Sequence, residues 1–259
     1  MDTRRATAFV LSAFLMVGFA AGCSPSNPAA TRAGSGKTLT VFAAASLKKA
    51  FSEIGETFKT DNPGTDVEFS FAGSADLVTQ LTQGAPADVF ASADGKNMAK
   101  MEKAGLLAGP SVNFASNTLT IVVTPGNPKN VSSFEDLTQP GLSVVVCAPQ
   151  VPCGSATQKA EQATGVRLNP VSEESQVTDV LNKVLTGQAD AGVVYVTDAQ
   201  GAGDKVTAVA FPESASTVNT YPIAVLKAAP DPELARKFMD MVTGDAGQKI
   251  LSAAGFGKP

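Results

Sequence analysis

Residues 39–51 read LTVFAAASLKKAF, and within them a strand pattern passes directly into a helix pattern. The apolar run ends in Ala43, Ala44 and Ala45, and Ser46 stands where an amphipathic helical pattern begins. Small residues and a hydroxyl at a helix start allow a ligand to approach the backbone closely. Serine is also a preferred helix cap, so this stretch by itself leaves both roles open.

The alternation of strand and helix continues along the chain. Apolar runs rich in Val, Ile, Phe and Thr predict strands at 38–43, 66–71, 88–91, 119–124, 142–147, 190–195, 206–211 and 220–226. Amphipathic patterns predict helices at 47–58, 77–81, 177–185 and 231–253. This alternation predicts an α/β fold with largely parallel sheets. Ligands of such sheets bind beyond the carboxyl ends of the strands, where the helices begin.

A second boundary of this kind lies in FSFAGSADLVTQL, residues 69–81, where Gly73 and Ser74 follow a strand pattern. Ser74 could again be a plain helix cap. Two such turns in one chain, each with small residues before the serine, favour an anion site made of backbone N–H groups and hydroxyls.

The first 23 residues have the order of a secretory signal. Arg4 and Arg5 precede an apolar run from 8 to 21, which ends in Gly22 and Cys23. The AAGC ending predicts a lipobox in which Cys23 is lipidated, so we expect an extracytoplasmic protein that is lipid-anchored to the cell membrane. An uncleaved membrane anchor is the alternative, but the run is short for a span of about 20 residues. Residues 24–36, rich in Pro, Ser and Gly, predict a flexible tether.

Composition excludes several classes of function. The formal net charge is −4 and no basic run occurs, which argues against nucleic acid as a partner. The chain has no histidine, so it lacks His-based catalytic triads, His general bases and the usual zinc ligands. We therefore expect no cofactor and no directly coordinated metal ion.

Two cysteines, Cys147 and Cys153, lie six residues apart in VVVCAPQVPCGSA. In an exported protein this spacing favours a disulfide, worth about 2 kcal/mol by the chain-entropy estimate. Two ordinary thiols are the alternative.

Four motifs together resemble the extracytoplasmic molybdate-binding proteins of ABC transporters: VFAAASLKKAF, FSFAGSADLVTQL, GAPADVFASAD and AGVVYVTDA. The resemblance covers residues 37–259 in order. It implies a type II periplasmic binding protein fold, in which two α/β lobes joined by two crossing strands close on the ligand. It also implies a permease and an ATPase as partners, and we expect a monomer.

The resemblance implies five ligand-binding positions. Ser46 and Ser74 would donate hydrogen bonds from side chain and backbone, Cys153 and Val177 from the backbone N–H, and Tyr195 from its hydroxyl. Cys153 departs from relatives that can have alanine there, and because only its backbone would act, the side chain is free to pair with Cys147.

The same resemblance suggests how the chain divides. We expect one lobe to combine 37–114 with 219–259 and the other to comprise 115–218, with crossings near 112–119 and 212–221. Ser46 and Ser74 then belong to the first lobe, and the other three positions to the second. Closure would bring the two sets together around the anion.

The resemblance implies molybdate, and tungstate with it, as the ligand. The chemistry agrees, because a fully deprotonated tetrahedral dianion needs a cage of donors only. A receptor for sulfate or another tetrahedral oxyanion is the alternative; sulfate has the same charge and differs chiefly in size. Ferric sites favour clustered tyrosines and phosphate favours an acceptor, neither of which the motifs supply. An exported hydrolase would need a base for Ser46 or Ser74, and only Lys48 or Lys49 is near Ser46 in sequence. Neither serine lies in a Gly-x-Ser-x-Gly turn.

Overall fold

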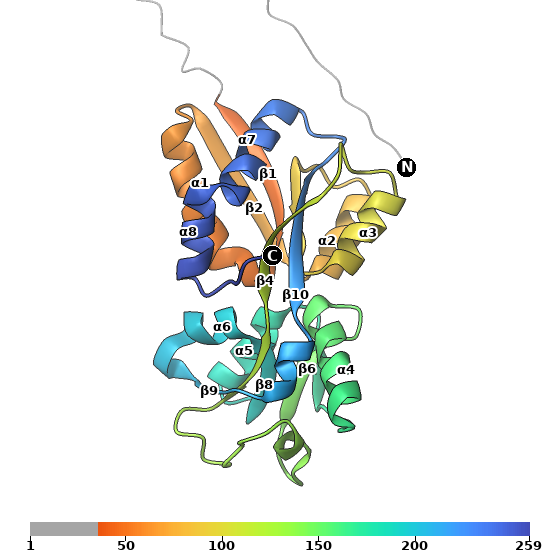
Figure 1. Ribbon diagram of the computed structural model, residues 1–259, viewed down its shortest axis with the longest axis vertical. Helices are drawn as coiled ribbons and strands as arrows, with labels where there is room; N and C mark the ends of the chain where they lie inside the picture. The colour runs from red at the N-terminus through yellow and green to blue at the C-terminus, as the bar shows by residue number, and fades with distance from the viewer. Residues whose placement is uncertain (1–35) are drawn as a thin grey trace, which may run out of the picture. The chain divides into compact units, whose positions relative to one another are not determined.

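The computed structural model describes residues 36–259. The predicted signal segment, the lipidated Cys23 and nearly all of the predicted tether therefore lie outside the described residues. From residue 36 onward the chain forms two α/β lobes, each built on a five-stranded sheet (Figure 1). No helix in this range is long and apolar enough to span a bilayer.

The first lobe contains a mixed sheet with helices on both faces. Its strands, in spatial order, are β2 (Thr65–Ala72), β1 (Lys37–Ala44), β3 (Val89–Ala91), β10 (Asn219–Val225) and β4 (Val112–Asn117). Strands β2, β1 and β3 are parallel, whereas β10 runs antiparallel to both of its neighbours. The helices are η1 (Ala45–Leu47), α1 (Lys48–Asp61), α2 (Ser74–Thr82), α3 (Gly95–Lys103), α7 (Pro232–Thr243) and α8 (Asp245–Ala253).

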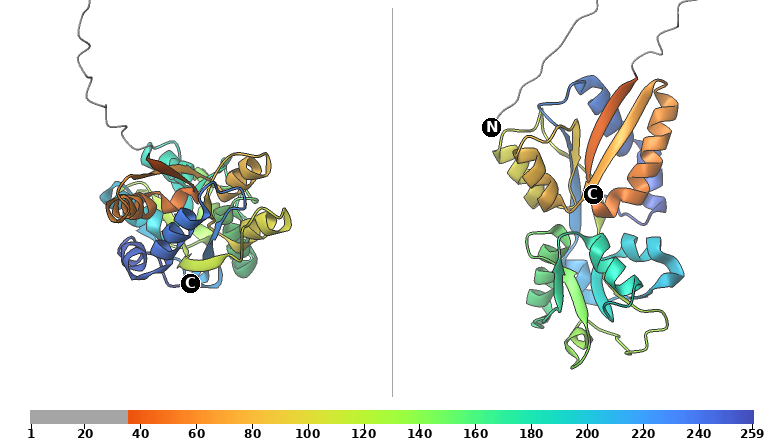
Figure 2. Two further views of the ribbon diagram at one scale, coloured as in Figure 1. Left: turned by 90° about the horizontal axis from the view of Figure 1, so that it is seen from above. Right: turned by 180° about the vertical axis from the view of Figure 1, so that it is seen from behind.

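The side chains of alternate residues of β1 point to opposite faces of this sheet, as strand geometry requires. Val41 packs in the core under α1, α7 and α8, whereas Phe42 packs in a second core under α2 and α3. Figure 2 shows these two helical layers on opposite sides of the sheet. The predicted apolar face of α1 is buried: Phe58 meets Phe238 of α7 edge to face, with ring centroids 5.4 Å apart.

The second lobe repeats this plan. Its strands, in spatial order, are β7 (Ser172–Glu174), β6 (Val144–Cys147), β8 (Ala191–Tyr195), β5 (Leu119–Val123) and β9 (Thr207–Val209). Strands β7, β6 and β8 are parallel, and β5 is antiparallel to β8 and β9. The helices are η2 (Glu135–Thr138), α4 (Pro152–Thr164), α5 (Val177–Leu185), α6 (Val196–Ala202), η3 (Gly203–Lys205) and η4 (Pro212–Ser216).

The chain passes between the two sheets twice. Only Thr118 separates β4 of the first sheet from β5 of the second, and the return runs through η4 into β10. The two crossing strands β4 and β10 pair with each other, with Asn219 opposite Asn117 (Figure 1). The junction between the lobes is therefore a short two-stranded ribbon.

The expectation of one helix over 231–253 is wrong. Helices α7 and α8 are separated by Gly244, whose extended backbone (ψ 175°) cannot continue a helix. The Gly244 N–H donates to the carbonyl of Asp240, and a β-carbon at Gly247 would overlap the carbonyl of Met241. The chain turns tightly here because neither position carries a side chain.

Candidate anion-binding site

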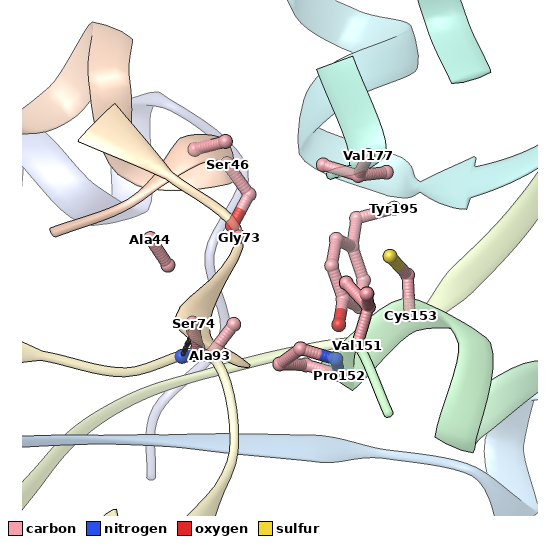
Figure 3. A pocket seen from close by; sticks show the side chains of 11 residues that line it. Ala44, Ser46, Gly73, Ser74, Ala93, Val151, Pro152, Cys153, Val177 and Tyr195 are labelled. Carbon is pink, nitrogen blue, oxygen red and sulfur yellow. Dashed lines mark hydrogen bonds between the residues drawn. The ribbon is translucent and has the colours of Figure 1, made fainter. Parts of the chain in front are cut away.

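A small pocket lies between the two lobes. It is lined by Ala44, Ala45, Ser46, Gly73, Ser74, Ala93, Val151, Pro152, Cys153, Val177 and Tyr195. All five positions that the resemblance implied are in this set. Figure 3 shows Ser46 and Ser74 on one side and Cys153, Val177 and Tyr195 on the other.

The first lobe contributes the carboxyl ends of its three parallel strands. Ser46 lies in η1 directly after β1, Ser74 is the first residue of α2 after β2, and Ala93 follows β3. Neither serine hydroxyl caps a helix, so the capping alternative is wrong for both. Ser46 Oγ lies 3.0 Å from the hydroxyl of Tyr221, and Ser74 Oγ accepts the N–H of Ala93 at 3.0 Å.

The second lobe contributes helix starts and a tyrosine. Cys153 is the second residue of α4, and Val177 is the first residue of α5. The first N–H groups of a helix have no intrahelical partner and carry its positive dipole end. Tyr195 ends β8, where its side chain is 1% exposed. These groups present donors to the pocket from the side opposite the serines.

The structure contains the predicted disulfide between Cys147 and Cys153, whose Cα atoms are 5.7 Å apart. It joins the last residue of β6 to the first turn of α4 and closes the loop that carries Val151 and Pro152. A β-carbon at Gly154 would overlap the carbonyls of Cys147 and Ala148, so the helix start lies tightly against the strand end. The covalent bond thus restrains the segment that presents the Cys153 N–H.

No side chain lining the pocket is ionisable except the phenol of Tyr195. Burial raises the pKa of Tyr195 well above its usual value, so its hydroxyl keeps its proton and can donate. Behind it, the buried carboxylate of Asp198 accepts the Tyr195 N–H at 3.1 Å. Burial raises the pKa of Asp198 to about 7. Among the described residues, no cluster of His, Cys, Asp and Glu could hold a metal ion.

Asp88 and Asp198 lie outside the pocket lining. The Asp88 carboxylate accepts the N–H of Thr40 at 2.8 Å and so ties the start of β3 to β1. Its role in the structure is to hold strands together.

Sequence reasoning missed several residues of the site region, among them Ala93, Asn117, Asn219 and Tyr221. Ala93 had a readable signal, because DVFASAD (residues 88–94) is a third strand end followed by small residues. The two asparagines and Tyr221 had none, since the groups they contact lie far away in sequence.

The chain belongs to the bacterial extracellular solute-binding protein family, whose profile matches residues 39–257. It is 60% identical over 253 residues to the molybdate-binding protein ModA of Mycobacterium tuberculosis, covering 96% of this chain and 97% of that protein.

Two solved structures share the fold. The periplasmic molybdate-binding protein of Azotobacter vinelandii has a TM-score of 0.75 at 23% identity, over 85% of this chain and 99% of that one. The sulfate-binding protein SubI of Mycobacterium tuberculosis has a TM-score of 0.74 at 21% identity, over 85% of this chain and 86% of that one. These likenesses confirm the two-lobed type II fold, and the family confirms a binding protein over a hydrolase.

Proposed function

We propose that this protein binds molybdate, and tungstate with it, and delivers the anion to the permease of an ABC transporter. The observation that carries the proposal is the interlobe pocket, lined by three hydroxyls and two helix starts, in a chain 60% identical to a molybdate-binding protein. The ligand set is Ser46, Ser74 and Tyr195 through their hydroxyls, and Cys153 and Val177 through their backbone N–H groups.

This donor set suits the ligand because a fully deprotonated tetrahedral dianion offers acceptors only. A neutral cage of hydroxyls and amides can hold such an anion without a lysine or arginine, since helix dipoles and charge-assisted hydrogen bonds supply the attraction. The negative net charge of the chain is then no obstacle to anion binding.

The contacts between the lobes support binding by closure. Helix α5 of the second lobe contacts η1 of the first, so Val177 and Ser46 come from elements that touch across the pocket. Ser46 is 9% and Ser74 is 1% exposed. The closed, ligand-loaded form would be the one that a permease recognises, with its ATPase on the cytoplasmic side.

Export, membrane anchoring and the division into lobes are inferred from the sequence. We infer a signal segment over 1–23, lipidation at Cys23, a tether over 24–36 and an extracytoplasmic monomer that is anchored to the cell membrane. The lobes are proposed to be 37–114 with 219–259, and 115–218. A diacylated cysteine is a two-chain attachment, which suffices for stable anchoring.

Sulfate is the second candidate ligand. A sulfate-binding protein shares the fold, and sulfate matches molybdate in charge and in its lack of donors. The identity to this structure is 21%, so the likeness speaks for the fold and not for the anion.

Calorimetric titration of the exported domain with molybdate, tungstate, sulfate and phosphate tests the proposal. We expect tight binding of molybdate and tungstate, weaker binding of sulfate and no binding of phosphate. Tighter binding of sulfate than of molybdate would make the protein a sulfate receptor, and heat from none of the four anions would refute an oxyanion site.

A further inference from the structure

Each hydroxyl of the pocket has one proton, and the group behind its oxygen decides where that proton can point. For Ser74 this group is the backbone N–H of Ala93, at 3.0 Å from Ser74 Oγ. An amide N–H can only donate, so the Ser74 oxygen accepts. Its own proton is left for the pocket.

The hydroxyl of Tyr195 is controlled by Asn219. Asn219 Nδ2 lies 2.8 Å from the carbonyl oxygen of Ala93 and 2.9 Å from Tyr195 Oη. A carbonyl can only accept, which fixes the amide with its nitrogen toward Ala93. The same nitrogen therefore donates to Tyr195, so the Tyr195 oxygen accepts, and its proton is available to the pocket or to the neighbouring Tyr221 hydroxyl.

The hydroxyl of Ser46 is controlled through Tyr221 by Asn117. Asn117 Oδ1 accepts the N–H of Thr118 at 3.0 Å, which fixes this amide as well. Asn117 Nδ2 then faces Thr197 Oγ1 at 2.8 Å and Tyr221 Oη at 3.5 Å. Because the Tyr221 oxygen faces this amide donor, we assign the Tyr221 proton to Ser46 Oγ, 3.0 Å away, which leaves the Ser46 proton for the pocket.

Asn117 and Asn219 are partners in register on the crossing strands β4 and β10. Both are buried, and each joins groups of both lobes. Asn219 contacts Ala93 of the first lobe and Tyr195 of the second, while Asn117 contacts Thr197 of the second and Tyr221 of the first sheet.

We propose that Asn117 and Asn219 are positioning residues that turn the hydroxyl protons of the pocket toward the ligand, Asn219 through Tyr195 and Asn117 through Tyr221 and Ser46. This inference rests on the proposed function of the pocket. Its consequence is selectivity. With the hydroxyl protons turned toward the ligand, an anion that itself carries a proton, such as monohydrogen phosphate, presents a donor to donors and binds less well.

A double-mutant cycle tests whether Asn219 acts on the ligand through the Tyr195 hydroxyl. Asn219→Leu removes the amide at similar volume and should weaken molybdate binding by about fivefold to twentyfold, less than loss of a hydroxyl. In a Tyr195→Phe background the same change should cost almost nothing, because the hydroxyl on which it acts is gone. Equal losses of molybdate affinity in the wild-type and Tyr195→Phe backgrounds would show that Asn219 does not act through Tyr195.

Tyr221→Phe removes a single hydroxyl and tests the route from Asn117 through Tyr221 to Ser46. It should weaken molybdate binding by a similar factor and should be silent in a Ser46→Ala background. If Ser46 instead donates to Tyr221, removing the Tyr221 hydroxyl frees the serine proton, and affinity for molybdate should hold or rise. That result would overturn the proposed direction.

The ratio of phosphate to molybdate binding distinguishes a positioning role of Asn219 from a purely structural one. Competition by phosphate at mildly alkaline pH, where the monohydrogen form dominates, should rise relative to molybdate in Asn219→Leu, because the Tyr195 oxygen can now accept. Asn97→Leu is the matched control, since Asn97 is equally buried but bonds to Asp94 outside the pocket; it should lower melting temperature without altering this ratio. An unchanged ratio in Asn219→Leu refutes the positioning role. If Tyr195→Phe and Ser46→Ala leave molybdate affinity unaltered, the proposal that this pocket binds molybdate is refuted.

Discussion

Gly73 lies against the carbonyl oxygen of Ser175 across the pocket, so closely that a β-carbon at position 73 would overlap that oxygen. Gly73 belongs to the first lobe, between β2 and α2, whereas Ser175 lies in the second lobe, between β7 and α5. The φ of Gly73 is −59°, which any residue can adopt, so the missing side chain matters for the approach of the lobes and not for the backbone conformation.

Gly73→Ala should therefore hold the lobes apart. The overlap can be relieved by opening, so we expect the melting temperature without ligand to change little and molybdate affinity to fall by about 10- to 100-fold. Calorimetry measures the affinity, and small-angle scattering with saturating ligand should show a more open form than wild type. Gly95→Ala is the control, because a β-carbon there meets nothing within 4 Å. Wild-type affinity in Gly73→Ala would mean that the contact yields easily.

The pocket hydroxyls give a second prediction. Ser46→Ala, Ser74→Ala and Tyr195→Phe each remove one donor from a dry site, and hydrogen bonds to charged groups are worth roughly 1.5–3 kcal/mol. Molybdate affinity should fall by about 10- to 150-fold in each, with no new preference for phosphate.

Thr120→Val controls for loss of a buried hydroxyl elsewhere, since Thr120 donates to the carbonyl of Val209 away from the pocket. It should affect melting temperature alone. Unaltered dissociation constants in all three pocket variants would remove the site from consideration.

The disulfide gives a third prediction. Replacing Cys147 and Cys153 with alanine should cost about 2 kcal/mol of stability yet leave the order of anion preference unchanged, because only the backbone N–H of Cys153 is proposed to contact the ligand. In the native protein, reduction should add two hydrogens to the intact mass, and alkylation of this pair should require reductant. Ready alkylation of both thiols without reductant would contradict the bond.

All five proposed ligand positions line the pocket, and two of them, Ser46 and Ser74, are marked in the sequence at boundaries between strand and helix. The carboxyl ends of parallel strands gather at one edge of a sheet, so Ser46 and Ser74 meet once their strands pair. Tyr195 and Val177 follow the same rule in the second lobe. The alternation of strand and helix marked the two serines, and the resemblance supplied the other three positions.

The groups that support these positions could not be predicted in this way. Asn117 and Asn219 become partners only through the pairing of β4 with β10, and no local pattern marks that pairing. The polar strand β7 likewise exists because β6 offers it a parallel edge, with Ser172 opposite Val145. Tertiary pairing, and not local preference, decides such elements.

The predicted anchor gives a fourth prediction, on residues outside the described range. Wild type should partition with membranes, whereas Cys23→Ser should yield a soluble exported form or an unprocessed precursor. Detergent partitioning and N-terminal mass measurement distinguish these forms. A wholly soluble wild type, processed at a residue other than Cys23, would rule out the lipoprotein.

The buried carboxyl of Asp198 gives the fifth prediction, on pH. Burial raises its pKa from the usual 3.8 to about 7, so between these values the folded protein holds a proton that the unfolded chain has released. The free energy of unfolding should therefore fall as pH rises from about 4 to about 7, by up to about 4 kcal/mol from this group, and level off above. Asp198→Asn can still accept the Tyr195 N–H and should lose this slope.

Asp136→Asn is the control for this prediction. The backbone N–H and hydroxyl of Ser132 lower the Asp136 pKa to about 2, so its contribution to stability is complete above about pH 4 and is lost only as pH falls toward 2. Denaturant unfolding of wild type and both variants across this range measures the slopes, and equal slopes in wild type and Asp198→Asn between pH 4 and 7 would show that Asp198 titrates normally.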